Sequence, residues 1–206
     1  MTIIKYDNDK NIYVKFLDEY EFIIKTQYKL FKNGNIKNPY DKEVLNVGYI
    51  GFGDFKTSNN CKHTKEYETW LSMMHRCYDE KYQKNHPTYK DCILCEEWHC
   101  FQNFGKWYRE NYYEIDGQQM CLDKDVLRQN KKIYSPETCI FLPKCINSVF
   151  TKKAKSYAPT GVYKYEDKFM ASCKNFQSSS CYLGIFNTQD EAFQIYKTYK
   201  ENIFKN

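Results

Sequence analysis

The sequence predicts an α+β fold, in which small sheets and amphipathic helices follow one another in three regions. Three observations predict this class. Apolar and polar residues alternate between residues 11 and 26, apolar residues recur at helical spacing between residues 64 and 108, and three strand patterns precede a helical pattern after residue 160. The chain's 20 tyrosines and 14 phenylalanines can fill the cores that such regions need.

The first region, residues 1–58, is predicted to be a small β-hairpin and helix module. NIYVKFLDEYEFIIKT alternates on both sides of a polar tip at Asp18-Glu19, which is typical of a hairpin. TQYKLFKNGNIKNP predicts a short helix that ends at Gly34, with Pro39 beyond it. VGYIGFGDF predicts a strand broken by three glycines, and KTSNNCKHTK predicts a loop.

The second region, residues 59–151, is predicted to be a helix pair followed by a strand–turn–strand–helix element. Thr64 precedes one helical pattern, and a second pattern starts near Glu97, after a loop around His86-Pro87. The element that follows has strands at 120–127 and 138–142 around the polar turn RQNKK, and then a short helix that carries Asn147.

The third region, residues 157–206, is predicted to be a three-stranded sheet with one helix. GVYKYEDKFMASCKNFQSSSCYLGIFNT holds three strand patterns, with breaks at Glu166-Asp167 and at the serine run. Thr188 and Glu191 form a capping box at the start of the helix. Its apolar face is predicted to contain Ala192, Ile195, Tyr196 and Tyr199.

The net positive charge is concentrated in the third region together with the linker before it. The chain has a formal net charge of +5, and the segment from Lys152 onward has nine lysines, no arginine and five acidic residues, which is +4. This bias is compatible with a polyanionic partner such as nucleic acid.

Other compositional features concern compartment and metal. No apolar run approaches the roughly 20 residues that cross a membrane, and the N-terminus has no signal-peptide pattern. We therefore expect no membrane association and an intracellular location, in the cytoplasm of a host cell. Only Cys92 and Cys95, of ten cysteines, form a CxxC pair. We expect reduced, small apolar thiols rather than a structural zinc site.

The third region resembles the Apetala-type, or ethylene-response-factor-type, DNA-binding domain. The matching motifs are Gly161-Val162, Phe169-Met170-Ala171, Leu183-Gly184-Ile185-Phe186 and Thr188-Gln189-Asp190-Glu191-Ala192. The resemblance implies a sheet that binds the major groove of double-stranded DNA. The alternative is a small domain with a solvated lysine face, because arginine, the usual reader of guanine, is absent. The side chains expected to face DNA are Tyr163, Lys164, Lys168, Ser172 and Lys174.

The second region resembles HNH endonucleases of phages and mobile elements. The matching motifs are TWLSMMHRCY, CEEWHCFQNFGKWY, LDKDVL and YSPETCIFLP. The resemblance implies a divalent metal, Mg²⁺ or Mn²⁺, held by Asp123 and Asn147, with the catalytic base at the position of Lys124. The family's middle asparagine falls near Thr138. The alternatives are that Asp123 lies on a solvated strand face and that Asn147 stabilises a turn.

Lys124 is the main departure from the family, which has histidine there. Lysine titrates near 10.4 and histidine near 6.5, so a lysine base at pH 7 needs a downward shift of about three units, or roughly 4 kcal/mol. Asp123, Asp125 and a DNA phosphate would oppose that shift. We therefore expect Lys124 to hold phosphate or stabilise a transition-state charge.

Three functional hypotheses follow. The favoured one is a DNA-binding HNH-like endonuclease, whose catalytic activity the sequence leaves open. The second is a catalytically inactive DNA-binding or regulatory protein of the same architecture. The third is a viral anti-defence protein that binds another protein.

TQYKLFKNGNIKNP also resembles a small N-terminal module of phage proteins, in which Lys29, Lys32 and Lys37 would contact phosphate or simply form a solvated helix face.

Overall fold

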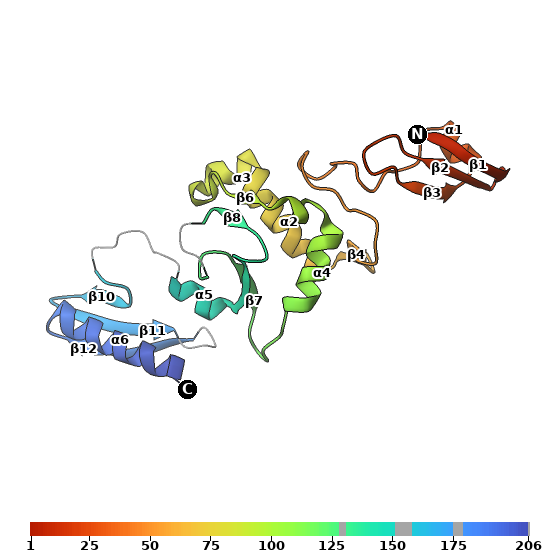
Figure 1. Cartoon of the computed structure of the whole chain (residues 1–206). Helices are drawn as coiled ribbons and strands as arrows, with labels where there is room; N and C mark the ends of the chain where they lie inside the picture. Colours follow the sequence, from red (N-terminus) through yellow and green to blue (C-terminus); the bar gives the residue numbers. More distant parts are fainter. Residues whose placement is uncertain (128–130, 151–157, 175–178, 206) are drawn as a thin grey trace. The chain divides into compact units, whose positions relative to one another are not determined.

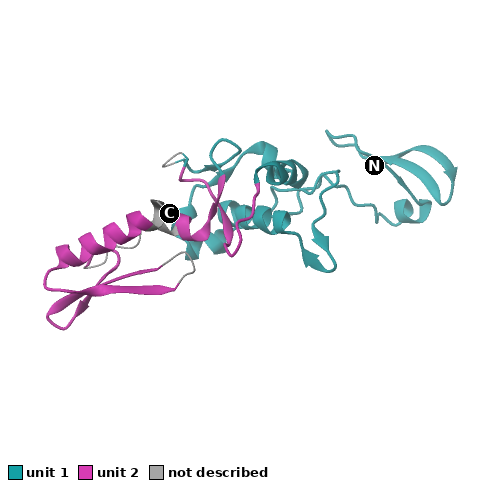
Figure 2. Cartoon of the chain, turned by 90° about the horizontal axis from the view of Figure 1, so that it is seen from below, with its two compact units in different colours: residues 1–111, 127–139 teal, residues 112–126, 140–206 magenta. Residues whose placement is uncertain are grey.

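The protein has an α+β fold, which confirms the predicted class (Figure 1). The computed structural model describes residues 1–127, 131–150, 158–174 and 179–205. The chain forms two compact units (Figure 2). Unit 1 comprises residues 1–111 and 127–139, and unit 2 comprises residues 112–126 and 140–206. The three regions of the sequence analysis are therefore grouped differently in space, since residues 59–151 contribute to both units.

Unit 1 starts with a three-stranded antiparallel sheet in the order β1-β2-β3. The predicted hairpin is present as β2 (Asn11–Lys15) and β3 (Ile23–Thr26), and it forms because Ile12 and Val14 bury one face of β2. Strand β1 (Thr2–Asn8), which pairs with β2, was not predicted. The predicted helix is α1 (Tyr28–Lys32).

The glycine-rich stretch does not form the predicted broken strand. It makes only isolated bridges, from Val44 to Gly48 and from Tyr49 to Cys100. A Cβ at Gly48 would lie 2.7 Å from Met74 Cε and 2.9 Å from Trp70 Cζ2, so this position has room for hydrogen alone. The expected loop after it contains the two-residue strands β4 (Ser58–Asn59) and β5 (Lys62–His63).

The predicted helix pair forms the core of unit 1. Helix α2 (Lys65–Tyr78) is capped by Thr64, whose side chain accepts the Tyr67 N–H over 3.3 Å. A short α3 (Glu80–Asn85), which was not predicted, comes next, and the expected loop around His86-Pro87 contains the 3₁₀ turn η1 (Pro87–Tyr89). The second predicted helix is divided into η2 (Glu96–His99) and α4 (Phe101–Asn111).

The two helical segments are joined through buried aromatic side chains. Trp70 Nε1 donates to Trp98 O over 2.7 Å, and Trp70, Trp98, Phe101 and Phe104 are all fully buried. Strand β6 (Ile93–Leu94) pairs in parallel with β8 (Ile133–Tyr134), with Leu94 opposite Tyr134. Unit 1 thus takes one of its strands from a segment far along the sequence.

Unit 2 contains the predicted strand–strand–helix element. Strand β7 (Met120–Asp123) pairs antiparallel with β9 (Ile140–Pro143), and α5 (Lys144–Phe150) follows β9 directly. Both strands are shorter than predicted. Side-chain hydrogen bonds end β7 at Asp123 and hold Thr138 in a turn before β9.

The C-terminal part of unit 2 is the predicted sheet and helix. Strands β10 (Val162–Tyr165), β11 (Lys168–Lys174) and β12 (Ser180–Phe186) form an antiparallel sheet in that order. Helix α6 (Gln189–Lys205) lies along one face of it (Figure 1). The capping box is present, since Thr188 N donates to Glu191 Oε2 over 3.2 Å and Glu191 N donates to Thr188 Oγ1 over 3.3 Å.

The core between the sheet and α6 differs from the prediction at Ile195 and at Phe193, which was not predicted. Val162, Ala171 and Ala192 are buried, and Phe193 packs against them. Ile195, predicted to face the core, is 42% exposed. Helix α6 therefore contributes Ala192 and Phe193 to this core.

Some predicted features lie outside the described residues. They are the centre of the RQNKK turn, residues 128–130, and the lysines of the linker before the C-terminal sheet, Lys152, Lys153 and Lys155. Within the described parts of the chain, no helix is both long and apolar enough to cross a membrane.

Candidate functional site

The candidate catalytic element is built from β7, β9 and α5. Leu122 pairs with Phe141 across the two strands, and both side chains are buried. Tyr113 OH donates to Phe141 O over 3.0 Å, and Lys144 N donates to Gln119 O over 2.7 Å. These bonds fix the start of α5 beside the start of β7. Since Leu122 faces one side of the strand, Cys121 and Asp123 face the other.

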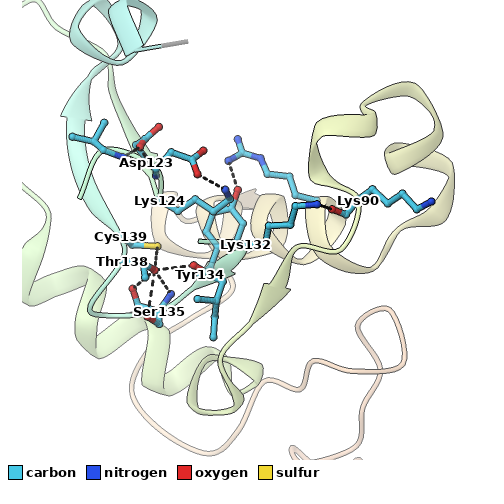
Figure 3. A network of polar contacts seen from close by, with 12 residues as sticks. Lys90, Asp123, Lys124, Lys132, Tyr134, Ser135, Thr138 and Cys139 are labelled. Atoms are coloured by element: carbon cyan, nitrogen blue, oxygen red, sulfur yellow. Dashed lines mark hydrogen bonds and ion pairs between the residues drawn. The ribbon is translucent and has the colours of Figure 1, made fainter. Parts of the chain in front are cut away.

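Asp123 ends β7 with its own side chain. Its Oδ1 accepts the backbone N–H of Asp125 over 2.8 Å and that of Val126 over 2.9 Å (Figure 3). This is the turn that aspartate side chains form by imitating a backbone carbonyl. The two bonds use one carboxylate oxygen, so Oδ2 is the oxygen that a metal ion could take.

Asn147 lies beside the same face of β7. Its Nδ2 donates to Cys121 Sγ over 3.3 Å, from α5 to β7. Cys121 and Asp123 are two residues apart, and residues at that spacing lie on one face of a strand. The structure therefore brings the two predicted metal ligands, Asp123 and Asn147, to one face of the element.

The donor atoms of this pair fit a hard divalent cation. Mg²⁺ prefers oxygen ligands and is often bound through one or two protein groups together with substrate phosphates. Within the described residues, no group of three or more His, Cys, Asp or Glu side chains could hold a metal ion. Asp123 and Asn147 would therefore need water or phosphate oxygens to complete the coordination shell.

Lys124 is buried and ion-paired. Its side chain is 9% exposed, and its Nζ lies 2.6 Å from Oδ1 of Asp125, whose side chain is 60% exposed (Figure 3). Burial of a charge without a partner is costly, and this ion pair gives the Lys124 side chain a carboxylate partner. An ammonium has three donors and no acceptor, and it cannot take a proton from water.

Thr138, the position of the family's middle asparagine, has a structural role within unit 1. Its Oγ1 donates to Ile133 O over 2.8 Å and accepts the Ser135 N–H over 3.0 Å. Ser135 Oγ in turn donates to Glu137 Oε2 over 2.7 Å (Figure 3 labels Ser135 and Thr138). The YSPET motif is therefore a turn stabilised by its own hydroxyl groups.

A half-buried arginine in unit 1, Arg76, was not singled out by the sequence analysis. Arg76 Nη1 donates to Tyr134 OH over 3.4 Å, and the guanidinium lies 5.3 Å from the ring centroid of Tyr89. Burial raises the pKa of the Tyr134 phenol, and the nearby Arg76 charge opposes that shift. Arg76 therefore lies beside the phenols of Tyr134 and Tyr89, and its place in the TWLSMMHRCY helix was the only signal in the sequence.

The second candidate site is the face of the C-terminal sheet opposite α6. The register pairs Tyr163 with Met170 and Ile185, and Ser172 with Tyr182. Opposed residues of an antiparallel pair point to the same side, and Val162, Ala171 and Phe169 face the helix. We call the other side the outer face; it consists of Tyr163, Tyr165, Lys168, Met170, Ser172, Lys174, Ser180, Tyr182 and Ile185.

Four of the five predicted DNA-facing residues lie on the outer face. Lys164 does not, because it pairs with Phe169, which packs against the helix side of the sheet. The burial of Val162, two residues before Lys164, sets this orientation. Tyr165 and Tyr182 lie on the outer face and were missed, although simple alternation from Tyr163 would have found Tyr165.

Neither a family model nor a curated protein nor a solved structure matches this chain. The resemblances to HNH endonucleases and to Apetala-type domains therefore stay predictions, and the site geometry is the basis for a functional proposal.

Proposed function

We propose that this protein binds DNA through its C-terminal sheet and cleaves phosphodiester bonds at the β7–β9–α5 element, as an HNH-like endonuclease. The observation that carries the proposal is the contact between Asn147 and Cys121, which brings Asn147 to the strand face that holds Asp123. The outer face, with Lys168 and Lys174 both exposed, supports the DNA-binding part.

Each residue of the element has a distinct role in this proposal. Asp123 Oδ2 and the Asn147 side-chain oxygen would hold Mg²⁺ or Mn²⁺, which would supply charge neutralisation at the scissile phosphate. Lys124, paired with Asp125, would place a positive charge beside the substrate. Water must then give its proton to a group other than Lys124 or to solvent.

A second candidate is a DNA-binding protein without nuclease activity. The ion pair between the buried Lys124 and the exposed Asp125 favours it, because the family's base position then holds a lysine engaged with a carboxylate instead of a histidine. Under this alternative the ββα element would contribute to DNA binding or to a protein contact, as in an anti-defence protein.

Incubation of the protein with supercoiled plasmid and Mn²⁺, beside an Asp123→Ala variant, tests the proposal. Nicking by the natural protein alone, with loss of nicking in EDTA, is the expected result. Intact plasmid in both reactions, together with salt-dependent binding in a gel shift, would favour the inactive DNA-binding protein. Absence of binding to any nucleic acid at low salt would contradict both candidates.

A further inference from the structure

The outer face of the C-terminal sheet is rich in exposed aromatic rings. Tyr163, Tyr165 and Tyr182 are 52%, 49% and 64% exposed. Each ring could bury much more of its surface if a binding partner covered it. Isolated exposed tyrosines are ordinary in strands. Three of them on one small sheet, beside Ile185 at 41% exposure, form a patch of stacking and apolar surface.

The register arranges these rings in successive rows. Tyr165 lies opposite Lys168, Tyr163 lies in the next row with Met170 and Ile185, and Tyr182 lies in the row after that, opposite Ser172. Adjacent rows on one face are about 6.6–7 Å apart along the strands. The three rings therefore lie in three different rows of the sheet, and the row spacing keeps them from stacking on one another.

The charges on this face suit a phosphate backbone. Lys168 and Lys174 are the first and last residues of β11, so one positive charge lies in the row of Tyr165 and the other lies beyond the row of Tyr182. Across the described residues of the three strands, the outer face has no acidic side chain. Glu166 and Asp167 are in the turn beyond β10, outside these rows.

The side chains present fit base faces better than base edges. Duplex DNA is read in the major groove chiefly by arginine, asparagine and glutamine, which bind base edges with paired hydrogen bonds, although lysine and serine can also contact base edges. The described outer face has none of these three residue types. Stacking on an aromatic ring needs a base face, and base faces are covered by neighbouring bases in a duplex.

We propose that the outer face binds single-stranded DNA, with unpaired bases stacking on Tyr163, Tyr165 and Tyr182 and the backbone held by Lys168 and Lys174. This inference rests on the proposed DNA-binding function and specifies its ligand. The protein would then act on DNA that is already unpaired, or would hold one strand of an opened duplex.

Fluorescence anisotropy in EDTA, which prevents cleavage, tests the inference with the full chain. The probes are a labelled thymidine oligonucleotide of about 16 nucleotides, near the upper site size of small single-strand-binding domains, and the duplex of the same sequence. We expect tighter binding of the single strand. Tyr182→Ala is expected to weaken it about 5- to 150-fold, the range for loss of one stacked base, whereas Tyr182→Phe keeps the ring and the affinity.

Tyr6→Ala is the matched control, because Tyr6 is 55% exposed on β1 and should leave affinity unchanged. Equal or tighter binding of the duplex, or no loss in Tyr182→Ala, would overturn the single-strand inference and leave the DNA-binding proposal intact. Absence of binding to either probe would overturn both. Tighter binding of a single-stranded RNA of matching sequence would overturn DNA as the ligand.

Discussion

Asn147 on α5 donates a hydrogen bond to Cys121 on β7 across 3.3 Å. Thiol sulfur is a weak acceptor, so the value of this contact is positional rather than energetic. It sets the helix against the strand face that ends in Asp123. The proposed metal pair therefore depends on the packing of one short helix against one short strand.

Replacing Asp123 by asparagine distinguishes the structural role of its side chain in the turn from the role of its negative charge. Asparagine can still accept the N–H groups of Asp125 and Val126, so the fold should be kept. The lost carboxylate should reduce Mn²⁺-dependent nicking by about 100-fold or more, since a metal contributes several kcal/mol to the transition state. Plasmid nicking rates measure this, and circular dichroism checks the fold. Full nicking activity in Asp123→Asn would remove Asp123 from the metal site.

Replacing Lys124 by histidine tests the missing base. Histidine titrates near 6.5 and is mostly neutral at pH 7, so it can accept a proton that the ammonium cannot. If Lys124 occupies the base position, Lys124→His should raise the nicking rate by about 100-fold, the lower end of general-base contributions. Lys124→Gln, which is neutral but no base, is the control. An equal change in both variants would mean that only the lysine charge matters.

Gly161 is held against the ring of Tyr196. Its φ is +84°, and a Cβ there would lie 2.1 Å from Tyr196 Cδ2. Gly161→Ala should therefore lower the free energy of unfolding of the C-terminal sheet by more than about 1 kcal/mol. Hydrogen exchange of the β10 and β11 amides measures it. Gly117→Ala is the matched control, because Gly117 has a φ of +71° with nothing within 4 Å of the added Cβ. Equal losses in the two variants would show that backbone strain alone, without the ring contact, decides the cost.

The capping box at the start of α6 gives a second stability prediction. Thr188→Ala removes the acceptor for the Glu191 N–H and should cost about 1 kcal/mol. Thr188→Ser keeps the hydroxyl and should cost only a fraction of that. Urea unfolding followed by helical circular dichroism compares the two. Identical midpoints for alanine and serine would mean that the cap contributes nothing to α6.

Asp79 gives a prediction for pH dependence in unit 1. The hydrogen bond from His75, and then the backbone N–H of Tyr82, hold the pKa of Asp79 below its usual value. A carboxyl whose pKa is lowered by folding stabilises the protein above its unfolded pKa of about 3.9, and this stability is lost as pH falls through the lower folded pKa. Asp79→Asn keeps the cap on α3 but cannot titrate. Its unfolding midpoint should fall less steeply than that of the natural protein below about pH 4. Parallel curves would contradict the assignment.

Local patterns were sufficient where the signal lies in adjacent residues. The hairpin of β2 and β3, the Thr64 cap, the capping box of α6 and the order of β7, β9 and α5 could all be predicted. Each depends on alternation or on contacts between residues three or four apart, which the sequence displays directly.

The remaining features depend on partners far along the chain. Strands β6 and β8 have two residues each and pair in parallel across about forty positions, from Ile93 to Ile133, so no local pattern marks them. The orientation of Lys164 was wrong because the burial of Val162, and not the polarity of lysine, sets the face. Strand β7 ends at Asp123 because the Asp123 side chain accepts a backbone N–H from Asp125 and forms a turn. The surrounding sequence alternates as a strand does and so conceals this turn.

The division of the chain into units has a consequence for biosynthesis. Residues 127–139 belong to unit 1, yet the ribosome makes them after residues 112–126 of unit 2. Strand β6 therefore cannot pair with β8 until Tyr134, the partner of Leu94, has been synthesised. A nascent chain that stops at residue 111 has the helix pair but an unpaired sheet edge, so a fragment for expression should extend through Cys139.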